Sequence, residues 1–181
     1  MMRFGYVMMT YFAAMGIAIA AFIPTPTKLI WNATASTPIG FYTVEPTDRI
    51  EVPELVAVKP PEPLAVFMVE RGYIGRGVPL LKRVVGLSGQ RVCRIGRTIT
   101  VDGVEMGEAL ERDRIGRDLP VWQGCRVIGN GEIFLMNWEV RDSLDGRYFG
   151  PTPASSVIGR ALPLWTDEEV VGRFEWRAPT H

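Results

Sequence analysis

The sequence predicts a mainly β protein, in which an antiparallel β domain follows one apolar N-terminal helix. Short runs rich in Val, Ile, Leu and Thr recur along most of the chain and are separated by Gly, Pro or Asp, a pattern typical of antiparallel strands and turns. Residues 4–23, by contrast, carry no charge and lack these turn residues apart from two glycines. A helix of that length rises about 30 Å, which matches the hydrocarbon layer of a membrane.

We therefore expect three segments: a short cytoplasmic N-terminus at residues 1–3, a transmembrane anchor in contact with lipid at residues 4–23, and a periplasmic domain at residues 24–181. A cleavable secretory signal is the alternative, because Ala18-Ile19-Ala20 resembles a small-residue cleavage site. The uncharged run is longer than the roughly 7 to 15 apolar residues of a signal peptide, which favours the anchor. Both readings export the rest of the chain.

Within the domain, strands are predicted wherever β-branched and apolar residues gather between turn residues. They lie at residues 40–44, 55–58, 80–85, 91–95, 98–101, 126–128, 132–135 and 157–161. Asp102-Gly103 is the expected hairpin turn, because this dipeptide suits a tight connection between two strands. One helix is predicted at residues 63–71, with a proline in its first turn and Gly72 at its end. Residues 107–123 are charged and irregular and are expected to form an exposed loop.

The charge and cysteine content exclude several classes of protein. The chain has 20 basic and 20 acidic residues, with no basic stripe, so we expect no nucleic-acid partner. Cys93 and Cys125 are its only cysteines. In an exported domain they are expected to form a disulfide, the alternative being two separate buried thiols. Without histidine partners they make a poor zinc site, and no metal or other cofactor is predicted.

Lys82 is the candidate general base. The chain has one histidine, His181, at its terminus, where a base is rarely held in place. Lys82 lies within an apolar stretch at residues 78–87, whereas Lys28 and Lys59 lie at the end of the anchor and before two prolines. Burial of a lysine lowers its pKa and favours the neutral amine, which can accept a proton near neutral pH. The alternative is an edge-strand lysine that points into solvent.

Ser36 is the candidate nucleophile. Small residues precede it, and Pro38 and Gly40 follow, so its hydroxyl is accessible on a stiff backbone. It also lies about a dozen residues after the predicted anchor, which would place it near the membrane surface. Taken alone, Ser36 could equally be an ordinary loop serine.

Three ordered blocks link these two residues to a known family. They are Ser36-Thr37-Pro38-Ile39-Gly40-Phe41-Tyr42, Leu81-Lys82-Arg83-Val84-Val85-Gly86-Leu87-Ser88-Gly89 and Asp142-Ser143-Leu144-Asp145-Gly146-Arg147-Tyr148-Phe149-Gly150-Pro151. Together they resemble the conserved boxes of the type I signal peptidases (family S26). The form of the first block is most similar to the conjugative-transfer branch of TraF-like pilin-maturation peptidases. The resemblance covers roughly residues 29 to 165 and implies a signal-peptidase-like antiparallel β catalytic domain.

The resemblance implies a Ser/Lys dyad, with Ser36 as nucleophile and Lys82 as general base. Thr34 matches a hydroxyl that forms the oxyanion hole together with the Ser36 backbone N–H. Ser143 matches the hydroxyl that orients the lysine. The family's chemistry would thus be carried by side chains from all three blocks.

The third block also supplies a structural acid–base pair, Asp145 and Arg147, expected near the site. Three features depart from the common pattern of the family: one residue separates Ser36 from Pro38 where general leader peptidases commonly have two, Gly146 replaces a frequent serine, and Gln90 replaces a frequent aspartate. These departures argue against the housekeeping leader peptidase and leave the expected chemistry in place.

The expected function is a membrane-anchored serine endopeptidase that processes a conjugative pilin precursor. Its acyl-enzyme is released by water, or by the substrate's own N-terminus to give a cyclic product. Expected partners are the pilin precursor or another exported protein, and components of a conjugation or type IV secretion channel. Two alternatives remain: a general signal peptidase that removes secretory leaders, and a non-catalytic, membrane-anchored scaffold of such a channel.

Overall fold

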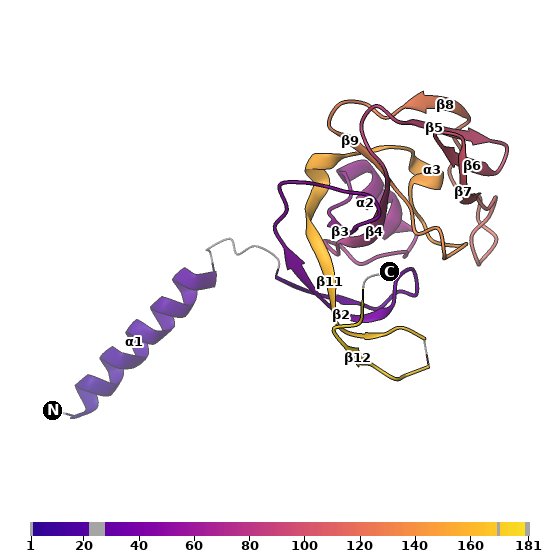
Figure 1. Cartoon of the computed structure of the whole chain (residues 1–181). Coiled ribbons are helices and arrows are strands. Elements are labelled where there is room, and N and C mark those ends of the chain that lie inside the picture. Colours follow the sequence, from indigo (N-terminus) through magenta and orange to yellow (C-terminus); the bar gives the residue numbers. More distant parts are fainter. Residues whose placement is uncertain (1, 22–27, 170, 180–181) are drawn as a thin grey trace.

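A computed structural model describes residues 2–21, 28–169 and 171–179 of the 181-residue chain (Figure 1). The first element, α1, is an α-helix at Met2–Ala21. Within the described ranges, no helix combines the length and the apolar character that a membrane crossing needs. The predicted anchor at residues 4–23 ends in two residues that lie outside the described part.

Most of the domain is built on one curled antiparallel sheet, which confirms the mainly β prediction (Figure 1). Its strands follow the order β1-β2-β11-β3-β4-β9-β10, and β12 pairs with β11. Their bounds are β1 Leu29–Asn32, β2 Ile39–Glu45, β3 Leu55–Val58, β4 Leu80–Gly86, β9 Glu132–Leu135, β10 Thr152–Pro153, β11 Val157–Asp167 and β12 Glu175–Trp176.

A second, four-stranded antiparallel sheet lies beside the first and has the order β7-β6-β5-β8. These strands are β5 Arg91–Ile95, β6 Thr98–Val101, β7 Val104–Glu108 and β8 Gly124–Val127. Asp102 and Gly103 connect β6 to β7 with φ angles of 48° and 82°, so the predicted hairpin turn is confirmed. Cys93 of β5 is the register partner of Cys125 of β8, and the two sulfurs form a disulfide.

Three short helices complete the fold: α2 at Glu62–Glu70, α3 at Gly146–Phe149 and a 3₁₀ turn at Ala154–Ser156. The helix predicted at residues 63–71 is α2, displaced by one residue at each end. The loop predicted at residues 107–123 is wrong at its start, because Gly107 and Glu108 pair with β6 as the end of β7. The charged remainder is largely irregular until β8 begins.

The central strand β3 separates two hydrophobic core clusters. Leu55 and Ala57 pack into one cluster, whereas Val56 and Val58 pack into the other. Successive side chains of a strand point to opposite faces, so both faces of this part of the sheet are covered. Strand β4 lies between β3 and β9, and its Lys82 is only 4% exposed. The predicted burial of Lys82 is confirmed, and the edge-strand alternative is wrong.

Candidate active site

The loop between β1 and β2 that carries Ser36 is organised by one buried amide, Asn32. Its Nδ2 group donates to the carbonyl oxygens of Thr34 (2.8 Å), Thr37 (3.0 Å) and Pro38 (3.0 Å). Its Oδ1 atom accepts from the Thr34 backbone N–H (3.1 Å) and from the Thr34 hydroxyl (2.8 Å). These bonds cross the loop from side to side, so the Ser36 backbone is held although it lies in no helix or strand.

The hydroxyls of Thr34 and Ser36 lie 3.1 Å apart. A hydroxyl has one proton to donate, and that of Thr34 is directed to Asn32 Oδ1. Ser36 is therefore the donor in the contact between the two hydroxyls. With its proton held by a neighbouring oxygen, the Ser36 hydroxyl has a defined direction before any substrate arrives.

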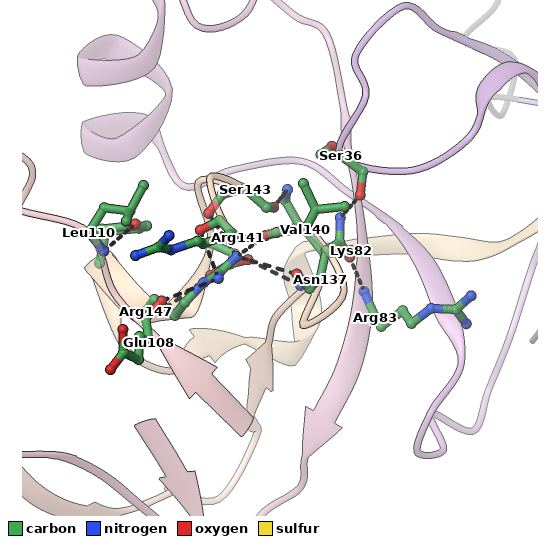
Figure 2. Close-up of polar contacts among 12 residues, drawn as sticks. Ser36, Lys82, Arg83, Glu108, Leu110, Asn137, Val140, Arg141, Ser143 and Arg147 are labelled. Carbon is green, nitrogen blue, oxygen red and sulfur yellow. Dashed lines mark hydrogen bonds and ion pairs between the residues drawn. The ribbon is translucent and has the colours of Figure 1, made fainter. Parts of the chain in front are cut away.

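Lys82 brings a buried amine to the same site from the middle of β4. Its Nζ donates to Ser143 Oγ over 2.7 Å (Figure 2). Burial lowers the pKa of Lys82 from 10.5 to about 8; the charge of Asp145 opposes this shift and that of Arg147 adds to it. A substantial fraction of Lys82 is thus a neutral amine near physiological pH, able to accept a proton.

No hydrogen bond joins Ser36 Oγ directly to Lys82 Nζ among the described residues; each is bonded to a different hydroxyl. Catalytic contacts in free enzymes are often long and shorten only when substrate is bound. The resting geometry therefore places the candidate nucleophile and the candidate base in one cleft with separate partners. Proton transfer between them requires Lys82 Nζ or Ser36 Oγ to change its partner.

Asp145 and Arg147 form a buried ion pair behind this cleft, with Nη2 and Oδ2 2.9 Å apart and both side chains at most 1% exposed. Arg147 also donates to four backbone carbonyls of the preceding segment, those of Asn137, Val140, Arg141 and Ser143 (Figure 2). One guanidinium thus fixes the whole connection from β9 to α3. Ser143, which holds Lys82, lies on that connection.

Gly146, between the members of this pair, has a steric reason to be glycine. A Cβ at this position would lie 2.6 Å from the carbonyl oxygen of Leu135 and 2.6 Å from the Phe134 ring. No other residue fits without moving β9. The departure from the usual serine noted in the sequence is therefore a matter of packing in this chain.

Thr34, Ser36, Lys82 and Ser143 all line one cleft of about 640 Å³. Its lining includes small residues close to Ser36 in sequence, Ala33 and Ala35, and apolar ones such as Ile39, Leu80 and Leu144. It also includes charged side chains, those of Arg71, Asp113, Arg114, Arg117 and Asp142. A cleft of this size with a mixed apolar and charged lining suits several residues of an extended peptide.

The sequence analysis missed two residues that organise the site, Asn32 and Asn137. Asn137 follows β9, is 4% exposed, and donates from Nδ2 to the Ser36 carbonyl over 2.7 Å. Both asparagines stand at the end of an apolar run, Leu29–Trp31 in one case and Ile133–Met136 in the other. An asparagine that ends an apolar run was the available signal. The described residues contain no group of His, Cys, Asp and Glu side chains suited to a metal ion.

Comparison with known proteins assigns the chain to a family. The family model described as "Signal peptidase, peptidase S26" matches residues 1–165. The chain belongs to this family. The plasmid transfer protein TraF of Escherichia coli is 34% identical over 137 residues, which cover 70% of this chain and 76% of that protein. The conjugal transfer protein TraF of Agrobacterium fabrum (strain C58 / ATCC 33970) is 37% identical over 138 residues, with the same coverage of 70% and 76%.

A crystal structure of a signal peptidase I from Enterococcus faecalis V583 is also similar to this chain. It is 23% identical, covers 62% of this chain and 98% of its own, and has a TM-score of 0.37. At that TM-score the likeness adds nothing to the placement of individual residues. The family membership rests on the sequence match and on the relatives named above.

Proposed function

We propose that the protein is a serine endopeptidase that uses Ser36 as nucleophile and Lys82 as general base, and that it processes a conjugative pilin precursor. The observation that carries the proposal is the buried Lys82 amine, with its lowered pKa, in the same cleft as the Ser36 hydroxyl. Family membership supports a peptidase, and the TraF relatives are named for plasmid or conjugal transfer. The cleft of about 640 Å³, with its partly apolar lining, supports a peptide substrate.

In the proposed reaction, Ser36 Oγ attacks the carbonyl carbon of the cleaved bond while neutral Lys82 takes the hydroxyl proton. The negative charge on the carbonyl oxygen is held by the Ser36 backbone N–H and by the Thr34 hydroxyl, which turns away from Asn32 to donate. The lysine ammonium then gives its proton to the leaving amine, and an ester to Ser36 remains. Ser143 accepts a hydrogen bond from Lys82 and keeps the amine directed into the cleft.

Either water or an amine can release the ester, since both are nucleophiles that Lys82 can deprotonate. Water gives a linear product. The substrate's own N-terminus gives a new peptide bond and a cyclic product that is one water lighter. We propose the pilin precursor as the source of both reacting ends, because relatives of this chain are named for conjugal transfer.

The test is co-expression of the protein with the pilin gene of the same transfer system, followed by intact mass measurement of the pilin. We expect a processed product, either linear or lighter by one water, with the wild type and none with Ser36→Ala or Lys82→Ala. Wild-type processing by Lys82→Ala would overturn the dyad. A panel of ordinary secretory precursors is the comparison, and efficient cleavage of those would favour a general signal peptidase.

A non-catalytic scaffold is distinguished by a serine-directed acylating probe. The scaffold predicts no difference between wild type and Ser36→Ala, whereas a peptidase predicts a label on the wild type alone. Intact mass of the labelled protein reports both the extent and the stoichiometry of the reaction.

We further propose that the protein is bound to the inner membrane with its β domain on the periplasmic side. The uncharged residues 4–23 support this location, as do three exposed tryptophans: Trp31 of β1, Trp165 of β11 and Trp176 of β12 are 46%, 42% and 66% exposed. Tryptophan favours the boundary between membrane and water. Membrane fractionation and protease protection of spheroplasts test the location; recovery in the soluble cytoplasmic fraction would overturn it.

A further inference from the structure

Asn137 bonds to the backbone on both sides of Lys82 and to the backbone of Ser36. Its Oδ1 accepts from the Arg83 N–H (3.0 Å), and its Nδ2 donates to the Leu81 carbonyl (3.1 Å) and the Ser36 carbonyl (2.7 Å) (Figure 2). Among the described residues, no other side chain bonds both to the loop at residues 33–38 and to β4. Asn32 holds the loop internally, and Asn137 is the side chain that bonds this loop to the strand of Lys82.

The fold explains how a side chain comes to make these bonds. Strand β9 pairs with β4 up to Leu135, and the Met136 N–H still donates to the Arg83 carbonyl over 2.9 Å. The chain then leaves the sheet. The Asn137 side chain forms hydrogen bonds with the next backbone groups of β4, the Arg83 N–H and the Leu81 carbonyl. An asparagine carries one acceptor and one two-proton donor, which is the set that these three backbone groups require.

Asn137 is itself held in place by the buried ion pair. Its backbone N–H donates to Asp145 Oδ2 over 3.1 Å, and its carbonyl accepts from Arg147 Nη2 over 3.3 Å. The same guanidinium bonds the carbonyl of Ser143, the partner of Lys82. A rigid set of bonds therefore runs from the ion pair through Asn137 to both halves of the dyad.

We propose that Asn137 is a positioning residue that sets the Ser36 hydroxyl relative to the Lys82 amine. This inference rests on the proposed dyad. Because no direct bond joins the two groups in the resting site, their separation is set by the backbone that carries them. A displacement of about 1 Å between reacting groups can cost about 10²-fold in rate.

The experiment compares Asn137→Ala and Asn137→Asp with the wild type at pH 8. Ala removes all three bonds, whereas ionised Asp keeps an acceptor for the Arg83 N–H but cannot donate to the Leu81 and Ser36 carbonyls. A fluorophosphonate is the probe, because it forms a phosphonate ester with Ser36, releases fluoride and is not removed by water; Ser36→Ala is the background. We expect the labelling rate constant to fall about 10²-fold in both variants, with the KI of the probe within about threefold of wild type because the cleft wall at Ala33 and Ala35 is intact.

The final extent of labelling, read by intact mass, separates positioning from folding. A positioning role lowers the rate constant and leaves the final extent near that of wild type. Gln90→Ala is the matched control, because Gln90 is another amide that fixes backbone near β4, accepting from the Leu87 N–H over 2.8 Å, but it lies outside the cleft. We expect its rate constant to stay within about threefold of wild type, as its bonds do not touch either reactive residue.

Wild-type rate constants in either folded Asn137 variant would overturn the inference. A loss confined to the extent of labelling, or failure of both variants to fold, would make Asn137 a folding residue and overturn it equally. Failure of the proposed dyad looks different, since the wild type would then be labelled no more than Ser36→Ala.

Discussion

Lys82 donates its hydrogen bond to Ser143 Oγ over 2.7 Å, from a position where burial has lowered its pKa to about 8. Ser143 is on the connection that Arg147 fixes, so the direction of the lysine amine is set by residues far from it in sequence. Figure 2 shows Lys82 together with Ser143 and Arg147.

Ser143→Ala should slow acylation of Ser36 by about 10- to 10²-fold, because the amine loses the partner that directs it while the base remains present. Ser143→Thr keeps a hydroxyl and should recover most of the rate. The measurement is the single-turnover acylation rate constant of both variants. An unchanged rate constant for Ser143→Ala would show that Lys82 needs no orienting hydroxyl.

Acylation should become faster as the pH rises through about 8 and then level off. The neutral amine is the active form, and with a pKa of about 8 it makes up roughly a tenth of Lys82 at pH 7. The rate constant measured from pH 6 to pH 10 gives the apparent pKa directly. Lys82→Arg is the control, since a guanidinium stays charged over this range and should be inactive throughout. A flat profile for the wild type would contradict the proposed role of Lys82.

The free energy of unfolding should also change with pH, because Lys82 has different pKa values in the folded and unfolded states. The pKa of this lysine is lower in the folded than in the unfolded state, so between pH 8 and 10.5 the unfolded state binds more protons. The free energy of unfolding should therefore rise with pH across that window, by up to about 3 kcal/mol in total. Lys82→Met removes this group and should lack the rise. Denaturant unfolding of both proteins at pH 7.5 and 10 makes the comparison, and parallel behaviour would mean that Lys82 titrates in the folded protein as it does in the unfolded chain.

Thr34→Val should reduce kcat by about 10²- to 10³-fold, the usual effect of removing one donor from an oxyanion hole. The substitution keeps the volume of the side chain but deletes the hydroxyl that contacts Ser36 Oγ and Asn32 Oδ1. Thr34→Ser restores the hydroxyl and should return activity to within about tenfold of wild type. If both variants were equally slow, the methyl group and not the hydroxyl of Thr34 would be the part that matters.

Much of the fold could be predicted from the sequence because its strands are short, apolar and bounded by turn residues. The bounds of β3, β5, β6 and β9 agree with the predicted ranges. Strand β7 was missed because Glu105, Gly107 and Glu108 interrupt the apolar pattern, yet their backbone groups pair with β6. The two-residue strands β10 and β12 carry no pattern that a sequence can show.

Site residues could be predicted where a side chain is unusual for its sequence surroundings. They could not be predicted where their role depends on the backbone groups that the fold brings near them. A lysine in an apolar run is visible in the sequence, and the structure buries it. The roles of Asn32 and Asn137 depend on which carbonyls and N–H groups come within reach once the strands have paired. The Asn137 bond to the Ser36 carbonyl joins residues 101 apart in the sequence, so no local pattern encodes it. The Asn32 bonds reach only two to six residues along the chain, but they depend on the path that the loop takes.

Breaking the buried pair of Asp145 and Arg147 should destabilise the whole domain. Arg147→Met leaves the Asp145 carboxylate buried without its cation and removes the donors to four backbone carbonyls of the connection from β9 to α3. Loss of one partner from such a pair typically costs about 3 to 5 kcal/mol, which corresponds to a fall in Tm of about 10 °C or more.

Arg112→Met is the matched control for that measurement, because Arg112 pairs with Asp118 at a site where both side chains are mostly exposed. Exposed pairs contribute little, so its Tm should match that of wild type. Thermal unfolding of the three proteins under one buffer condition gives the comparison. An equal, small shift in both variants would show that the buried pair is not what holds the connection carrying Ser143 in place.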